Sequence, residues 1–155
     1  MLTTTSSQKR VLFLCVGNSC RSQMAEALLR SHAGDRFAVF SAGLEPSIIH
    51  PYTVRVLDEI GIDSSEQFSK SVTKYINAPP FDYIITVCDD ARERCPIFPG
   101  SGTRLHWSFE DPARFVGTEQ QQIAKFREIR DLIDSRIRSW LDELNPQSST
   151  GKKIS

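Results

Sequence analysis

Short runs of apolar residues alternate along the chain with longer segments in which apolar side chains recur at helical spacing. Runs that are apolar at every position are typical of strands buried on both faces of a parallel sheet. Apolar positions three and four residues apart indicate helices that bury one side. The predicted strands cover residues 11–14, 37–42, 83–87 and 104–107, and the predicted helices cover residues 22–32, 51–60 and 118–144. This alternation predicts an α/β fold, a single-domain three-layer sandwich in which a four-stranded parallel sheet has helices on both faces.

The remaining segments are polar and set the boundaries of the domain. Residues 1–9 and 146–155 predict a flexible N-terminus and a flexible C-terminal tail around a folded domain of residues 10–145. Residues 88–103, rich in charge and proline, predict a loop. Ligands of parallel sheets bind beyond the carboxyl ends of the strands, so we expect the chemistry in the loops that follow these ends.

Composition and charge narrow the class of protein. The chain has 155 residues, 39% of them hydrophobic and 25% charged, which is ordinary for one globular domain. Nineteen basic and nineteen acidic side chains cancel, a balance that argues against a nucleic-acid or membrane partner. The start of the chain has no apolar run of signal-peptide length, and no segment approaches a membrane span. We expect a monomer in the cytoplasm, where its four cysteines serve catalysis, redox switching or metal binding.

The segment between the first predicted strand and the first predicted helix combines cysteine, glycine and arginine. It reads Cys15-Val16-Gly17-Asn18-Ser19-Cys20-Arg21-Ser22. A loop of this length can turn several backbone N–H groups inward around an anion, and the helix start adds its free N–H groups and positive dipole end. Arg21 adds a two-pronged contact to an oxyanion, and Gly17 can adopt a positive φ. We expect residues 16–22 to bind a tetrahedral oxyanion and Cys15 to attack it as a thiolate.

Spacing alone does not identify this site, because Cys88 and Arg94 have the same separation. That second pair encloses no glycine, and the acidic side chains between its members would repel an anion. The alternative for Cys15 is a small apolar residue that ends a strand. For Cys20, which lies inside the loop, we prefer a purely structural role as a small apolar residue.

An acidic pair follows the fourth predicted strand, on the same rim of the sheet as the Cys15 loop. It consists of Glu110 and Asp111, and Pro112 comes next. Displacement at a tetrahedral centre needs a proton donor for the departing oxygen, and Pro112 would fix the turn that holds such an acid. An ordinary Asp-Pro loop is the alternative. Beside the Cys15 loop we prefer Asp111 as the acid, with Glu110 as the weaker candidate.

Two further cysteines follow the third predicted strand, Cys88 at its end and Cys95 seven residues later. Additional thiols on the active rim suggest electron transfer by thiol–disulfide exchange. If the segment is helical, the two lie on one face ~10 Å apart, and a disulfide requires Cα atoms within about 7 Å. The segment would therefore have to bend or unwind. Buried free cysteines and a zinc site are the alternatives, although the spacing does not match the usual Cys-x-x-Cys ligand pairs.

Residues 11–29, VLFLCVGNSCRSQMAEALL, resemble the start of an arsenate reductase of the low-molecular-weight tyrosine phosphatase fold. The similarity continues through Ser41-Ala42-Gly43, His50-Pro51, Gly61-Ile62-Asp63, VCDDARERCP and HWSFEDPA. It covers most of the catalytic domain up to the final helix. The spaced pair Cys88 and Cys95 resembles the thioredoxin-coupled branch.

This resemblance implies a cascade of three cysteines. Cys15 attacks arsenate held by the loop and Arg21, and Asp111 protonates the leaving oxygen. Cys88 then attacks Cys15, which releases arsenite and leaves a Cys15–Cys88 disulfide. Cys95 attacks Cys88, and thioredoxin reduces the resulting Cys88–Cys95 disulfide. Phosphate or sulfate would mimic arsenate in the loop.

Some members of the family also bind a potassium ion near the loop. The resemblance assigns its side-chain ligands to Asn18, Glu26 and Ser41. A further acidic ligand is expected near Ser71, where this sequence has serine. The resemblance requires no cofactor, and potassium stays an open expectation. The alternative for Glu26 is an ordinary solvated residue of the helix.

Two other functions stay open at this point. A low-molecular-weight protein tyrosine phosphatase would hydrolyse phosphomonoesters through a phosphocysteine at Cys15. It would not need Cys88 and Cys95, and it usually has aromatic residues where this chain has Ala113 and Arg114. A non-catalytic redox sensor would form a disulfide with peroxide without turning over arsenate. The reductant is open between thioredoxin and a glutaredoxin or mycothiol system.

Overall fold

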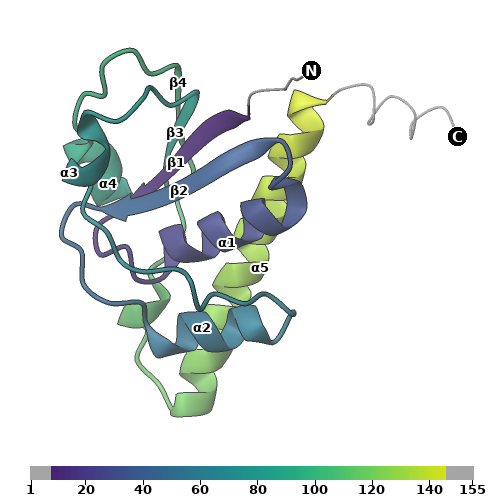
Figure 1. The fold of residues 1–155 in the computed structure, drawn as a ribbon. Helices are drawn as coiled ribbons and strands as arrows, with labels where there is room; N and C mark the ends of the chain where they lie inside the picture. Colours follow the sequence, from purple (N-terminus) through teal and green to yellow (C-terminus); the bar gives the residue numbers. More distant parts are fainter. Residues whose placement is uncertain (1–7, 146–155) are drawn as a thin grey trace, which may run out of the picture.

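Four parallel strands form the central sheet of the computed structural model, which describes residues 8–145 (Figure 1). The strands are β1 (Lys9–Cys15), β2 (Phe37–Gly43), β3 (Tyr83–Thr86) and β4 (Thr103–His106), in the order β2-β1-β3-β4. The register pairs Cys15 with Gly43 and Leu14 with Thr86, so the carboxyl ends meet at one end of the sheet. The predicted four-stranded parallel sheet is confirmed.

Helices cover both faces of this sheet. They are α1 (Arg21–Ala33), α2 (Pro51–Asp58), α3 (Thr73–Ile76), α4 (Asp89–Arg94) and α5 (Glu119–Leu144), with a short 3-10 helix, η1, at Pro112–Arg114. α1 and α5 lie side by side on one side of the sheet with α2 beyond them, and α3 and α4 lie on the other (Figure 1). The predicted three-layer sandwich is therefore confirmed.

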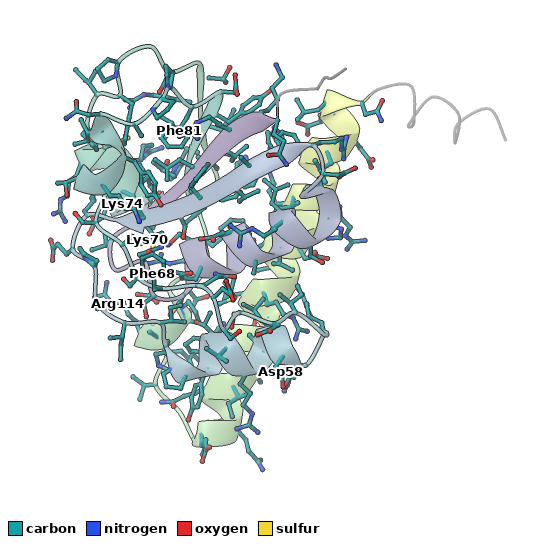
Figure 2. The ribbon with its side chains drawn as sticks, in the orientation of Figure 1. Asp58, Phe68, Lys70, Lys74, Phe81 and Arg114 are labelled. Atoms are coloured by element: carbon teal, nitrogen blue, oxygen red, sulfur yellow. The ribbon has the colours of Figure 1, made fainter. Side chains whose placement is uncertain are left out.

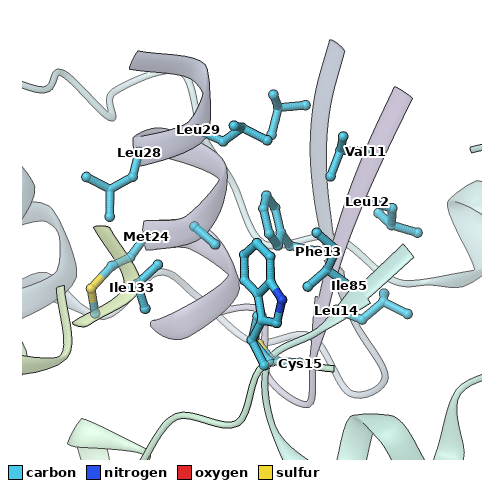
Figure 3. Close-up of a cluster of buried hydrophobic side chains, with 14 of the residues drawn as sticks. Val11, Leu12, Phe13, Leu14, Cys15, Met24, Leu28, Leu29, Ile85 and Ile133 are labelled. Atoms are coloured by element: carbon cyan, nitrogen blue, oxygen red, sulfur yellow. The ribbon is translucent and has the colours of Figure 1, made fainter. Parts of the chain in front are cut away.

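The first core layer lies between the sheet and the helices α1 and α5. The Phe13 ring of β1 packs against Trp107 with centroids 6.0 Å apart, and Trp107 meets Trp140 of α5 at 5.6 Å. Figure 3 shows Leu28 of α1 and Ile133 of α5 on the same side of β1 as Phe13. This packing fixes the start of α1 relative to the end of β1, where the site lies.

The second core layer lies on the opposite face and is mainly aromatic. The Phe81 ring packs against three other aromatic rings. The distances between ring centroids are 5.7 Å to Phe40 of β2, 5.9 Å to Tyr75 of α3 and 6.1 Å to Phe98. The Arg10 guanidinium lies 4.7 Å from the centroids of both Phe40 and Phe81. Strands with apolar residues at every position are thus buried on both sides, as the sequence pattern predicts.

The prediction of a continuous loop over residues 88–103 is wrong, because α4 occupies part of it. Only Ala91 of this helix is buried, so its sequence has no apolar periodicity to detect. Asp89 and Asp90 in the first turn complement the positive end of the helix. The four-residue helix α3 was also not predicted, for it is too short to show a periodic pattern.

The predicted flexible termini fall almost entirely outside the described residues. Lys9 is described and pairs with Phe37 of β2, so the first strand begins one residue before the predicted domain boundary. Within residues 8–145, every helix is too short or too polar to cross a membrane.

Candidate active site

Cys15 ends β1, and the turn after it surrounds its sulfur with hydrogen-bonding groups. The thiol is buried, with Sγ 2.8 Å from Ser22 Oγ and 3.2 Å from the backbone N–H of Asn18, which donates to it. Ser22 belongs to the first turn of α1, so the sulfur lies at the positive end of that helix. These contacts hold the Cys15 sulfur between the loop and the start of α1.

Asn18 shapes this turn, with a φ of 50°. The prediction that Gly17 supplies a positive φ is wrong, since the left-handed conformation falls on Asn18, a residue type that tolerates it. The buried Asn18 side chain is also held on three sides. Its Nδ2 donates to Ser22 Oγ at 2.8 Å and to Ser41 Oγ at 3.0 Å, and its Oδ1 accepts from the Lys70 N–H at 2.8 Å.

The loop carbonyls are bonded to the segment that follows β2. The N–H groups of Leu44, Glu45, Ser47 and His50 donate, in that order, to the carbonyl oxygens of Cys15, Val16, Gly17 and Ser19 at 2.8 to 3.2 Å. The N–H groups of Gly17, Ser19 and Cys20 have no backbone acceptor within residues 8–145. These N–H groups are the donors that a bound oxyanion would use.

Gly43 at the end of β2 allows this close approach. A Cβ there would lie 2.5 Å from the Val16 carbonyl oxygen and 2.9 Å from the Asn18 nitrogen. Sequence reasoning missed Gly43 as a site residue. The sequence offered only a partial signal, because Gly43 directly follows the predicted strand of residues 37–42, whereas its place beside Cys15 comes from the strand pairing.

Arg21 opens α1 and extends to the segment after β4. Its Nη1 donates to the Phe109 carbonyl oxygen at 3.1 Å, and its Nη2 lies 3.5 Å from Asp111 Oδ2. Its Nε is buried and has no partner among the described residues. A buried donor without an acceptor costs roughly 1–3 kcal/mol, so this nitrogen is suited to an oxygen of an anionic ligand.

A cavity of about 530 Å³ lies beside Arg21, and Val16, Cys88 and Asp111 also line it. Asp111 begins η1, where its Oδ1 accepts from the Ala113 N–H at 3.0 Å and its Oδ2 is the oxygen nearest Arg21. This arrangement brings a carboxyl group, a guanidinium group and a thiol to one cavity.

Glu110 also lines the cavity, yet its carboxylate is engaged elsewhere. Its Oε1 lies 3.3 Å from the ammonium nitrogen of Lys125 on α5. Of the two acids, Asp111 is therefore the one that pairs with Arg21.

Cys88 lies between β3 and α4, on the wall of the same cavity. Burial raises the pKa of its thiol, and the Cys15 charge adds to the rise. The Arg21 charge and hydrogen bonds from the Ala91 and Val16 backbone lower the pKa. The structure thus brings Cys88 into the electrostatic field of both Cys15 and Arg21.

Cys95 follows the last turn of α4 and lines a separate cavity of about 220 Å³. Burial raises the pKa of its thiol, and Arg104, whose Nη1 donates to Sγ at 3.4 Å, opposes the rise. All four cysteines are free thiols. Because α4 separates Cys88 from Cys95 by ~10 Å along its axis, the structure does not bring these two together.

Cys20 lies inside the loop and is buried. Burial raises the pKa of its thiol to about 11. The thiol is neutral at ordinary pH, which agrees with a structural interpretation of its side chain.

The three side chains predicted to bind potassium do come together. Asn18 Nδ2 donates to Ser41 Oγ, and the Ser41 hydroxyl donates to Glu26 Oε1. However, the Lys70 ammonium nitrogen lies at the same place, 3.4 Å from Ser41 Oγ and 3.7 Å from Glu26 Oε1. The other oxygen of Glu26 accepts from Arg30 Nη2 at 2.6 Å. Two cationic side chains therefore already pair with this carboxylate, and the cluster does not fit a potassium ion.

Neither the acidic potassium ligand expected near Ser71 nor the alternative of a zinc site gains support. Ser71, near which an acidic ligand was expected, has its hydroxyl 2.9 Å from Thr73 Oγ1. Across residues 8–145, no three side chains among His, Cys, Asp and Glu are grouped so as to hold a metal ion.

Comparison with known proteins agrees with this geometry. The family model for low molecular weight phosphotyrosine protein phosphatase matches residues 10–150. An arsenate reductase of Bacillus licheniformis is 45% identical over 138 residues, which cover 88% of this chain and 97% of the relative.

Solved structures of arsenate reductases share the fold. One in a phosphate-binding state is 31% identical with a TM-score of 0.71, covering 88% of this chain and 98% of the other. A thioredoxin-dependent arsenate reductase of Corynebacterium glutamicum is 37% identical with a TM-score of 0.70, covering 93% of this chain and 65% of the other. The resemblance inferred from the sequence is confirmed: the chain belongs to the low molecular weight phosphotyrosine protein phosphatase family and, within it, to the arsenate reductases.

Proposed function

We propose that this arsenate reductase transfers two electrons to arsenate through Cys15, Cys88 and Cys95 in succession. The observation that supports this most directly is the shared cavity, in which Cys88 lies with Arg21 and Asp111 beside the Cys15 loop. A phosphatase needs the loop and the acid, whereas it has no use for a second thiol on the wall of the cavity.

In the first step, the Cys15 thiolate attacks the arsenic atom and an S–As bond forms. The N–H groups of the loop and the Arg21 guanidinium hold the other oxygens. Asp111 gives a proton to the departing hydroxyl group of arsenate, which leaves as water. Arsenic remains in its oxidised state, bound to Cys15 as a thiol ester.

In the second step, Cys88 attacks the sulfur of Cys15. The S–As bond breaks and its electron pair stays on arsenic, which leaves as arsenite, and a Cys15–Cys88 disulfide forms. Cys95 then attacks Cys88 and releases Cys15 as a thiolate. A Cys88–Cys95 disulfide remains, and α4 must open to form it, because the helix holds these residues apart.

Thioredoxin is the reductant that we propose for this last disulfide. The thioredoxin-dependent relative from Corynebacterium glutamicum supports this choice over glutaredoxin or mycothiol. Residues of one chain supply every group that these steps use, so we propose that the protein acts as a monomer. We also propose that it acts in the cytoplasm, where thiols are kept reduced. No cofactor takes part in any step.

The experiment is arsenate-dependent NADPH consumption with thioredoxin and thioredoxin reductase, for the native protein and for Cys95→Ser. The proposal predicts turnover of the native protein and loss of multiple turnover in the variant. Failure to turn over arsenate, combined with hydrolysis of an aryl phosphate that survives Cys95→Ser, would instead identify a phosphatase. A peroxide-induced disulfide without turnover of either substrate would identify a sensor.

A further inference from the structure

Lys70 is a buried cationic side chain that the proposed reaction does not use. Its side chain is 6% exposed and lies in the segment before α3 (Figure 2). We propose that the Lys70 ammonium is a covalently attached cation that replaces potassium at the Asn18–Ser41–Glu26 cluster and positions the Cys15 loop. The reactivity of Cys15 should then be independent of potassium.

The ammonium has an oxygen-rich environment of the kind that potassium ions select. Lys70 Nζ donates to the Phe68 carbonyl oxygen at 2.6 Å and to Ser41 Oγ at 3.4 Å, and it lies 3.7 Å from Glu26 Oε1. It also lies 4.8 Å from the centroid of the Phe68 ring. A carbonyl, a hydroxyl, a carboxylate and an aromatic face thus surround a single positive charge.

Two paths connect Lys70 to the nucleophile, and both pass through Asn18. The Lys70 backbone N–H donates to Asn18 Oδ1 at 2.8 Å. The ammonium acts through Ser41, whose Oγ accepts from Asn18 Nδ2 at 3.0 Å. Asn18 in turn donates its backbone N–H to Cys15 Sγ. Since Asn18 has a φ of 50°, the loop depends on these restraints to keep that conformation.

Charge explains why a free ion is not needed. The Glu26 carboxylate is buried, and a buried carboxylate requires a compensating cation. Lys70 supplies one on Oε1, and Arg30 supplies a second on Oε2 at 2.6 Å. A potassium ion on the same carboxylate would meet two positive charges at close range.

The test measures the alkylation rate of Cys15 by iodoacetamide, followed by mass spectrometry of the Cys15 peptide. This readout needs neither arsenate nor a reductant, so it stays informative if the proposed function fails. The native protein should react equally fast in potassium chloride and in choline chloride at equal ionic strength. Lys70→Ala should react slower in choline chloride by roughly tenfold, as expected for loss of one charge-assisted hydrogen bond. Potassium or ammonium ions should restore its rate.

Two further variants separate positioning from packing. Lys70→Met keeps the apolar stem without the charge and should show the same slow alkylation while remaining folded by circular dichroism. Lys74→Ala removes an exposed ammonium from the same segment, 5.0 Å from the Phe68 ring, and should behave like the native protein. A native rate that rises with potassium would overturn the proposal. So would a Lys70→Ala rate that equals the native one, or a loss that no cation restores.

Discussion

The Arg21 guanidinium and the Asp111 carboxylate face each other at the cavity, with Nη2 3.5 Å from Oδ2. Arg21 belongs to the first turn of α1 and Asp111 to the start of η1, so the contact joins two distant segments of the chain. An ion pair that is partly open to solvent contributes little to stability. Its main consequence is geometric, since Arg21, the residue that we propose to hold the oxyanion, also orients Asp111, the candidate acid.

The first prediction concerns this acid. Asp111→Asn keeps an oxygen that can accept from the Ala113 N–H, so the turn at η1 should persist. It removes the proposed proton donor, and we expect the rate of arsenate turnover to fall by about 10²–10⁴-fold. Steady-state NADPH consumption measures this. Glu110→Gln is the matched control and should stay near the native rate, because the Glu110 carboxylate pairs with Lys125. A larger loss in Glu110→Gln would reverse the assignment.

The second prediction concerns the pH dependence of the Cys88 step. Burial raises the pKa of the Cys88 thiol, so its thiolate is scarce at neutral pH and increases as the pH rises. In Cys95→Ser, formation of the Cys15–Cys88 disulfide should accelerate about tenfold per pH unit below that pKa. The rise should continue beyond the pH at which an ordinary thiol has ionised. Rapid-quench single turnovers with mass spectrometry follow the disulfide.

A pH-independent rate from neutral pH upward would show that Cys88 is already ionised before it attacks. The control for this experiment is the double variant Cys20→Ser/Cys95→Ser, which is compared with Cys95→Ser alone. The Cys20 thiol, with a pKa of about 11, is neutral across most of the range and should leave the profile unchanged.

The sequence predicted the parts of the fold that have a periodic signal. The apolar runs at β1 and β3 and the spaced apolar positions of α5 each repeat a buried side chain over several residues. The Cys15 loop could be placed because a strand, a glycine-containing turn and a helix follow one another directly. In α4, by contrast, charged residues occupy almost every position, and the helix has no comparable pattern.

The other features that the sequence did not predict arise from contacts between distant segments of the chain. Glu26 and Lys70 meet across 44 residues of sequence, and no local spacing marks that meeting. The requirement for glycine at Gly43 arises from the Val16 carbonyl of another segment. Asn18 adopts the left-handed conformation because groups from β2 and from the Lys70 segment hold its side chain. Each of these features depends on tertiary packing.

The third prediction concerns opening of α4. Arg92 and Arg94 are exposed trypsin sites that lie within the helix while the cysteines are reduced. Closing a Cys88–Cys95 disulfide requires the segment to unwind, so oxidised protein should be cut there faster, by roughly tenfold or more. Limited proteolysis with mass spectrometry measures this. Cys95→Ser treated with the same oxidant is the control and should stay protected. Equal cleavage of both redox forms would mean that α4 does not open.

The fourth prediction compares Gly43 and Gly17, two glycines near Cys15. In Gly43→Ala, the new Cβ would lie 2.5 Å from the Val16 carbonyl oxygen, so the loop or β2 must shift. In Gly17→Ala, the nearest atom is Ser47 Oγ at 3.6 Å, an ordinary contact. We expect Gly43→Ala to lower the free energy of unfolding by about 1–3 kcal/mol and to slow alkylation of Cys15.

Urea denaturation of the two variants gives the comparison directly. Gly17→Ala should differ from the native protein in unfolding free energy by less than about 1 kcal/mol, because its φ does not require glycine and no atom is displaced. If Gly17→Ala were the more destabilised of the two, Gly17 would be the position that shapes the turn. The close approach of Val16 to Gly43 would then not be what holds the loop against β2.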